Sequence, residues 1–221
     1  LGGVSGAIYH SRDPLARLVP GCVPLDQRPT ARRNPWSDMA ADPTLHTMAD
    51  AMAYLAAQTN YEQRTDWSYQ RLGGHLRDFQ AFLEGIGAPH RLTMPVIHVA
   101  GTKGKGTTCT MLEAAYRDAG YRTGLYTSPH LERINERIQL AGEPISDARF
   151  VGLLERLRPD LDRMRTASRA VTFFEILTTL AFLAFAGDDE HPPVDVAILE
   201  VGLGGRLDAT NVVQADVAIV T

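Results

Sequence analysis

The chain has 221 residues, 44% of them hydrophobic and 22% charged, which is the composition of a soluble globular protein with room for one sizeable domain. A net charge of −4 at pH 7, without clustered basic residues, argues against nucleic acid as a partner. Two cysteines are too few for a disulfide framework or a thiolate zinc site, and no apolar run approaches the roughly 18 residues of a membrane-spanning helix. We therefore expect a cytoplasmic protein without a membrane partner.

The first part of the chain, residues 1–43, is rich in proline and shows little hydrophobic periodicity, as in "VPGCVPLDQRPTARRNPWSDMAADP". This composition predicts an irregular or disordered leader, to which we assign no function. Either Met39 or Met48 could be the translation start. The sequence begins with Leu1 and stops inside an apolar run, so we expect it to be a fragment.

Regular patterns begin at Thr44. Apolar residues at three- and four-residue steps predict two helices, one with Leu45, Met48, Met52 and Leu55 and one with Leu72, Leu76, Phe79 and Leu83. A strand over 96–100 precedes a glycine-rich turn and a helix that ends near Ala119, because Gly120 supplies a stop. The later elements are a strand in "YRTGLYTS", a strand and turn in "RIQLAGEPIS", a helix capped by Ser146, a buried helix in "TFFEILTTLAFLAFAG", and strands in "VDVAILEVG" and "ADVAIVT".

The order of these elements predicts the fold class. The last two strands are near-continuous apolar runs, as expected for parallel strands covered on both faces. Strands that alternate with helices predict an open, mostly parallel α/β sheet flanked by helices. Ligands bind such sheets at the carboxyl ends of the strands.

The stretch "VIHVAGTKGKGTTC" has most features of a phosphate-binding loop. Glycines at 101, 104 and 106 permit a tight turn, and Lys105 stands at the start of the following helix. Thr107 or Thr108 can offer a hydroxyl to a phosphate or to Mg²⁺. The strict pattern G-x-x-x-x-G-K-[ST] fails at Val99 and at Gly106, which follows the lysine. The alternative is a glycine-rich turn without a nucleotide, but the flanking strand and helix favour the nucleotide site.

"HVAGTKGKGTT" resembles the ATP-binding loop of the folylpolyglutamate synthase/dihydrofolate synthase family, a branch of the Mur-type ATP-dependent amide ligases, in which a glycine also follows the lysine. The resemblance extends to "YTSPHLERINERIQLAGEPIS", "TFFEILTTLAFLAF" and "LEVGLGGRLDATNVV", and covers about residues 49–221. Lys103 stands where the family usually has Asn, Thr107 where it usually has Ser, and Ile134 where it often has Phe. Lys103 either helps to bind the phosphates or points to solvent.

This resemblance implies a P-loop-containing fold of the Mur-ligase central-domain type. It also implies a ligase that uses ATP and Mg²⁺ to add L-glutamate to dihydropteroate, to reduced folates or to both, through an acyl phosphate. Residues 44–221 would be a truncated N-terminal ATP-binding domain without the C-terminal glutamate-binding domain, inactive on its own, and we expect a monomer. The alternatives are another Mur-type amide ligase, against which Gly106 argues, and a non-catalytic nucleotide-binding module, against which Lys105, Ser128 and Glu200 argue.

Glu200 ends an apolar strand beside the predicted phosphate loop, where a carboxylate is a natural Mg²⁺ ligand; a strand-end glutamate in solvent is the alternative. The resemblance adds Ser128 as a second metal ligand, with Thr107 as a further candidate, and makes Lys105 and Glu200 the catalytic residues. The residues expected to bind the nucleotide are Gly101, Thr102, Lys103, Gly104, Lys105, Gly106, Thr107 and Thr108. Those expected on the substrate side are Ser128, Pro129, His130, Asn135, Glu136 and Arg137.

A few polar residues lie outside these motifs. Glu175 stands in an otherwise apolar helix, so it either pairs with an arginine or faces the active cleft. His98 and Cys109 are predicted to be packed residues and not catalytic ones. Arg206 and Asp208 either organise the glycine-rich turn after Glu200 or form a local ion pair.

Overall fold

The computed structural model describes residues 45–60, 69–166 and 170–221, so the predicted leader 1–43 lies outside the described residues. Within these ranges no helix has the length and apolar character needed to cross a membrane.

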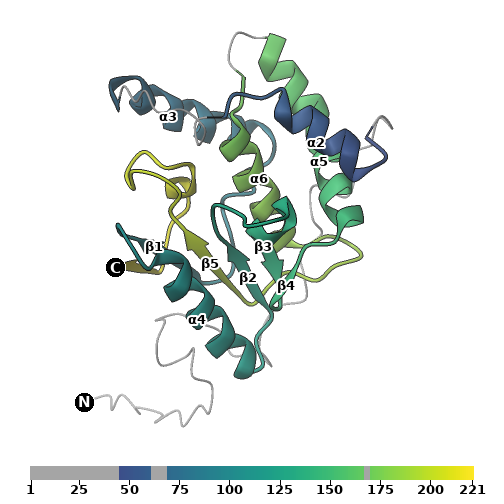
Figure 1. The fold of residues 1–221 in the computed structure, drawn as a ribbon. Coiled ribbons are helices and arrows are strands. Elements are labelled where there is room, and N and C mark those ends of the chain that lie inside the picture. The colour runs from purple at the N-terminus through teal and green to yellow at the C-terminus, as the bar shows by residue number, and fades with distance from the viewer. Residues whose placement is uncertain (1–44, 61–68, 167–169) are drawn as a thin grey trace, which may run out of the picture. The chain divides into compact units, whose positions relative to one another are not determined.

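Six strands form one sheet in the order β4-β3-β2-β5-β1-β6. Their bounds are β1 Val96–Ala100, β2 Thr123–Tyr126, β3 Ile138–Leu140, β4 Glu143–Pro144, β5 Val196–Glu200 and β6 Val217–Val220. Strands β2, β5, β1 and β6 run parallel, whereas β3 pairs antiparallel with β2 and β4 pairs antiparallel with β3. The predicted open, mostly parallel α/β sheet is therefore confirmed (Figure 1).

Helices cover both faces of this sheet. They are α2 Met48–Ala56, α3 Tyr69–Gly85, α4 Lys105–Asp118, α5 Asp147–Thr166 and α6 Phe173–Ala186, with short 3₁₀ helices η3 Ile134–Arg137 and η4 Ala209–Val212. On β2, the Thr123 hydroxyl donates to Glu113 of α4, whereas a Cβ on the next residue, Gly124, would lie 2.6 Å from Phe185 of α6. Because successive residues of a strand face opposite sides, α4 and α6 lie on opposite faces.

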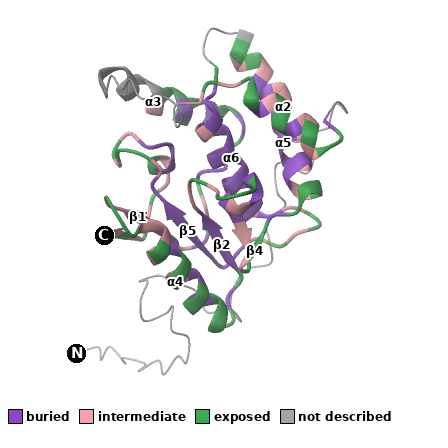
Figure 2. Ribbon diagram, in the orientation of Figure 1, coloured by how far each residue is buried: buried purple, intermediate pink, exposed green. Residues whose placement is uncertain are grey.

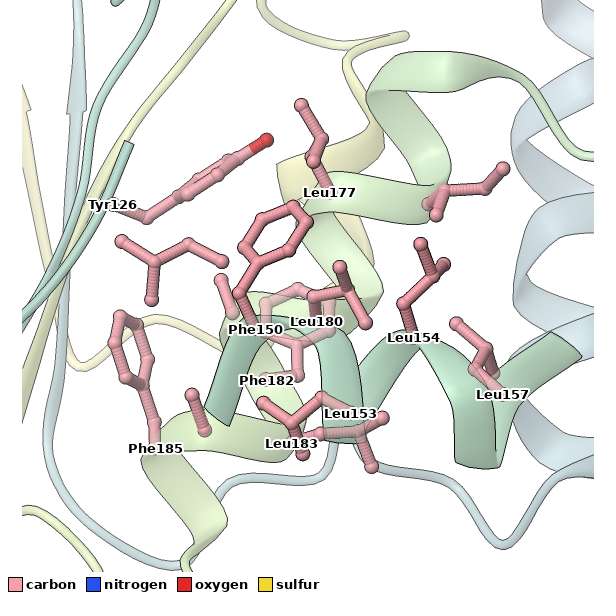
Figure 3. Packing of buried hydrophobic residues seen from close by; sticks show 14 of the residues in the cluster. Tyr126, Phe150, Leu153, Leu154, Leu157, Leu177, Leu180, Phe182, Leu183 and Phe185 are labelled. Atoms are coloured by element: carbon pink, nitrogen blue, oxygen red, sulfur yellow. The ribbon is translucent and has the colours of Figure 1, made fainter. Parts of the chain in front are cut away.

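The main core lies between α6, α5 and the sheet. Apart from Phe174 and Ala186, every residue of α6 is buried, as predicted from its apolar sequence (Figure 2). Its side chains meet Tyr126 of β2 on one side and the apolar stripe of α5 on the other (Figure 3). The members of that contact that Figure 3 labels are Tyr126, Phe150, Leu153, Leu154, Leu157, Leu177, Leu180, Phe182, Leu183 and Phe185. This packing fixes α6, and therefore its N-terminus, against β2.

Two elements are less buried than their apolar sequences suggest. Met52 shares the helical spacing of α2 but is 39% exposed, whereas Ala51 and Leu55 are buried. In the described part of the chain, the residues of β6 alternate between half-buried and exposed, and Val220 is 82% exposed. In contrast, β5 lies between β1 and β2 and is buried throughout. The predicted helix ends hold: Arg149 N–H donates to Ser146 Oγ over 3.3 Å, and Gly120 has φ of 88° just after α4.

Candidate active site

The site lies at the carboxyl edge of the parallel strands. Val99 of β1 pairs with Glu200 of β5, and Tyr126 of β2 pairs with Leu199. The segments that follow these three neighbouring strands therefore leave the sheet side by side, which is where open α/β sheets bind ligands. They are the predicted phosphate loop, the segment that begins at Ser128, and the glycine-rich turn after Glu200.

The phosphate loop runs into the N-terminus of α4. Gly104 caps the helix with a left-handed φ of 81°, and Lys105 is the first helical residue. Thr102, Lys103, Gly104 and Thr107 are exposed, whereas Thr108 is half-buried. The positive end of the helix dipole and a lysine thus meet at a turn open to solvent, as anion binding requires. The residues predicted to bind the nucleotide thus form the turn 101–104 and the first turn of α4.

Thr221 contacts this loop from the end of β6 and was not predicted. Its hydroxyl donates to the Lys103 carbonyl over 2.6 Å, and its N–H donates to the Ala100 carbonyl over 2.9 Å. A Cβ at Gly101, where φ is 140°, would overlap with Thr221. No local pattern marks Thr221, because its contact depends on the pairing of β6 with β1.

Glu200 is buried, with 5% of its surface exposed, so the alternative of a solvent-exposed strand end is wrong. Its carboxylate accepts the Ser128 N–H over 3.0 Å. Burial raises the pKa of Glu200, and the amides of Ser128 and Gly106 and the charge of Lys105 oppose that rise. The structure therefore gathers Lys105, Gly106, Ser128 and Glu200, as predicted.

Gly106 explains the departure from the usual phosphate-loop pattern. A Cβ on this residue would lie 3.5 and 3.6 Å from the two carboxylate oxygens of Glu200. The methyl group alone would be in ordinary contact, and any longer side chain would extend from there among the groups around the carboxylate. A glycine after the lysine thus leaves space beside Glu200.

The predicted substrate segment is tied together by its own side chains. Glu136 accepts the backbone N–H groups of Leu131, Glu132 and Arg133, and the first of these contacts is the main reason that its pKa is lowered. Asn135 is buried and donates to the Ile145 carbonyl over 2.7 Å. These contacts show both residues shaping the loop.

Arg137 and His130 form the other part of that segment. Arg137 is 2% exposed, lies 5.4 Å from the centre of the Phe173 ring, and donates through Nε to His130 Nδ1 over 2.8 Å. His130 is half-buried and the neighbouring Pro129 is exposed. Arg137 therefore orients His130 at the edge of the site.

A buried network organises the turn after β5. Asp208 accepts the Leu203 N–H over 2.7 Å and the Thr210 N–H over 2.9 Å, and the Thr210 hydroxyl lies 2.8 Å from His98 Nε2. Burial raises the pKa of Asp208, while these donors oppose the rise; burial lowers the pKa of His98. Of the two roles considered for Asp208, organising the turn is the one that these hydrogen bonds show.

The remaining polar residues have structural partners. Glu175 and Thr172 form a capping box at the start of α6, in which Thr172 N–H donates to the Glu175 carboxylate over 2.8 Å. The pattern T-x-x-E before an apolar run could have revealed this cap, which neither predicted role included. His98 is buried and packed, and so is Cys109, whose pKa burial raises to about 12.

No family model matches the chain, but comparisons with individual proteins find relatives. The dihydrofolate synthase/folylpolyglutamate synthase of Mycobacterium tuberculosis is 42% identical over 163 residues, which are 70% of this chain and 32% of that protein. The Bacillus subtilis protein of the same name is 37% identical over 168 residues, 74% of this chain and 38% of that protein.

Solved structures agree with these relatives. Mycobacterium tuberculosis folylpolyglutamate synthase complexed with ADP matches with a TM-score of 0.66 and 39% identity, over 78% of this chain and 36% of that one. An FPGS–AMPPCP–folate complex matches with a TM-score of 0.67 and 34% identity, over 79% of this chain and 40% of that one. The chain thus spans about a third of the length of these relatives, and it is homologous, in sequence and in fold, to a part of the proteins of the folylpolyglutamate synthase/dihydrofolate synthase family.

Proposed function

We propose that this chain is the nucleotide-binding part of an ATP-dependent ligase that joins L-glutamate to dihydropteroate, to a reduced folate or to both. One observation carries the proposal: Lys105, at the N-terminus of α4, and the buried carboxylate of Glu200 approach the same loop at the carboxyl edge of the sheet. The relatives named above support the substrate class, because one matched structure contains ADP and another contains AMPPCP and folate.

The phosphates of ATP would bind at the loop Gly101–Thr108. The N-terminus of α4 supplies backbone N–H groups and a partial positive charge, and Lys105 supplies a full charge at the same point. A phosphoryl group carries developing negative charge as it is transferred, so these positive groups stabilise the transition state. This assigns the catalytic role to Lys105.

The residues around Glu200 suit a magnesium ion that is shared with a nucleotide. Mg²⁺ in such sites is usually held by one or two carboxylates together with phosphate oxygens and waters. Glu200 is one such carboxylate, and the hydroxyls of Ser128 and Thr107 are the further candidate ligands. Among the described residues no group of three or more His, Cys, Asp or Glu could hold a metal. When bound, Mg²⁺ would neutralise phosphate charge.

The reaction follows from the weakness of a free carboxylate as an acyl donor. A carboxylate oxygen of the pterin substrate attacks the γ-phosphorus of ATP, the bond to the ADP oxygen breaks, and an acyl phosphate forms. The glutamate nitrogen then attacks the acyl carbon, loses a proton, and phosphate leaves with the bonding electrons. In this scheme the described residues position the reacting phosphoryl group and neutralise its charge, which are the main tasks in phosphoryl transfer.

The other parts of the ligase belong to the same proposal. The segment with Ser128, Pro129, His130, Asn135, Glu136 and Arg137 would line the substrate side, with Asn135, Glu136 and Arg137 acting through the loop that they stabilise. Residues 44–221 would form the ATP-binding domain, and a second, glutamate-binding domain would complete the cleft. The 221-residue chain alone would bind nucleotide weakly and catalyse no ligation.

The test uses the complete reading frame that contains this chain. It is incubated with ATP, Mg²⁺ and glutamate, with dihydropteroate or tetrahydrofolate in separate reactions, and products are weighed by mass spectrometry. A gain of one glutamate mass on either substrate supports the proposal and shows which job is performed. No gain on either, with ADP still bound, would leave a nucleotide-binding module and overturn the folate assignment.

A further inference from the structure

Three buried polar side chains connect strand β1 with the segment that follows strand β5. His98 of β1 is 9% exposed, Asp208 is 4% exposed, and Thr210 of η4 is fully buried. Buried polar groups are costly unless they are satisfied, so a connected set of three at one sheet edge calls for an explanation.

The direction of each hydrogen bond in this set can be derived. Asp208 Oδ1 accepts the Thr210 N–H over 2.9 Å, and Oδ2 accepts the Leu203 N–H over 2.7 Å. The single hydroxyl proton of Thr210 points to Asp208 Oδ1, 2.5 Å away. Thr210 Oγ1 must therefore accept from His98 Nε2, 2.8 Å away, which requires the Nε2–H tautomer of the imidazole.

The set spans the two halves of the candidate site. His98 lies three residues before Gly101, where the phosphate loop begins, and Leu203 lies three residues after Glu200. Between them, Gly202 is packed closely: a Cβ there would lie 2.5 Å from Phe174 Cζ and 3.1 Å from Asp208 Oδ2. The backbone just beyond Glu200 is therefore fixed both by hydrogen bonds and by close contact.

We propose that His98, Thr210 and Asp208 form a positioning network that fixes the turn Gly202–Gly205, and with it the Glu200 carboxylate, relative to the phosphate loop. This inference rests on the proposed function, since it assigns Glu200 a place beside bound nucleotide. None of the three residues need touch the ligand. They act by holding the turn that follows Glu200 against His98 of β1, the strand that leads to Lys105.

A matched control exists at the opposite edge of the sheet. Thr123, at the amino end of β2, is also fully buried, and its hydroxyl donates to the buried Glu113 carboxylate over 2.7 Å. Thr210→Val and Thr123→Val therefore both remove a bond from a buried hydroxyl to a buried carboxylate, from opposite ends of the strands, and Thr210→Val also removes the acceptor of the His98 N–H. General destabilisation affects both variants, whereas loss of positioning affects only the first.

The experiment measures ADP binding to the protein expressed from the complete reading frame by isothermal titration calorimetry, with and without Mg²⁺. In the wild type, Mg²⁺ should tighten ADP binding, and Thr210→Val should reduce that tightening by at least about fivefold, the effect of one lost hydrogen bond. Binding of ADP alone should stay unchanged, and Thr123→Val should behave as wild type. Where Thr210→Val does not fold, His98→Leu removes the donor to Thr210 and is measured in its place.

Two readouts without nucleotide complete the test. The ¹⁵N shifts of His98 should show the Nε2–H tautomer in the wild type, and the Leu203 amide should exchange faster in Thr210→Val than in Thr123→Val. An Nδ1–H tautomer, or equal effects of the two variants on binding and exchange, would overturn the network. If the wild type binds no ADP, the proposed function and the network's role in it fall together, whereas wild-type binding that Thr210→Val leaves unchanged overturns this inference alone.

Discussion

The two glycine-rich turns of the site are stabilised in opposite ways. The phosphate loop is open: Thr102, Lys103 and Gly104 are exposed, and the Thr221 hydroxyl contacts the loop through a backbone carbonyl. The turn Gly202–Gly205 also exposes Leu203 and Gly204, but it is closed on its inner side, where buried Asp208 accepts the Leu203 N–H and Phe174 packs against Gly202. Similar glycine content thus serves two tasks, access for a ligand in the first turn and placement of a buried carboxylate in the second.

The largest effect should come from the charge of the open turn. Lys105→Met should weaken ADP binding about 10- to 100-fold, the size of a lost charge-assisted hydrogen bond. The matched control is Lys103→Met, which removes an exposed charge in the same loop and should cost about fivefold or less. Isothermal titration of both variants measures the difference. Equal losses would mean that Lys103 binds the phosphates as directly as Lys105 does.

An added methyl group should lower the free energy of unfolding at Gly202 but not at Gly106, the second residue of α4. Gly202→Ala should lower the free energy of unfolding by about 1–3 kcal/mol, because its Cβ would lie 2.5 Å from the Phe174 ring. Gly106→Ala should be neutral or raise it by up to about 1 kcal/mol, since its Cβ meets only ordinary contacts and alanine favours a helix. Urea unfolding of both variants measures this. A Gly202→Ala variant as stable as the wild type would show that the turn or the Phe174 ring shifts at little cost to make room for the methyl group.

The smallest effect is a dependence on pH that the buried carboxylate introduces. Because burial raises the pKa of Glu200, the folded chain keeps this proton to a higher pH than the unfolded chain does. The free energy of unfolding should therefore fall as pH rises from the unfolded pKa, about 4.3, through the raised pKa of the folded chain, with a slope of up to about 1.4 kcal/mol for each pH unit between the two. Glu200→Gln removes this contribution, so the variant should gain stability relative to wild type over that range. The free energy of unfolding of both proteins is measured by urea unfolding between about pH 4 and pH 8. If it changes with pH by the same amount in the wild type and in Glu200→Gln, the prediction is contradicted.

The sequence was informative where a pattern is local. The helix over Phe173–Ala186 follows from its apolar run, and the phosphate loop follows from glycine spacing before a helix. The position of a strand in the sheet is not local: β5 and β6 look alike in sequence, yet in the described part of the chain β5 lies between β1 and β2, whereas β6 pairs with β1. Edge or centre depends on the order of pairing, and no residue of either strand encodes that alone.

The candidate site divides in the same way. Lys105 and Glu200 could be picked out because each follows a recognisable strand, and the structure brings them together. The contact of Thr221 with Lys103 and the chain from His98 through Thr210 to Asp208 could not, since each joins residues more than a hundred positions apart. The role of Glu175 was also not predicted, although its capping box with Thr172 is a local sequence pattern that could have been recognised.

The burial of Cys109 has a practical consequence. The thiol lies on α4 just past the phosphate loop, fully buried and with its pKa raised to about 12, so it reacts with alkylating reagents only when that part of the helix opens. The rate at which the Cys109 thiol is alkylated therefore reports local opening of the structure next to Lys105 and Glu200. A ligand that closes the loop would slow this alkylation. With the reagent in excess, each opening would lead to alkylation, so the labelling rate would equal the rate of opening.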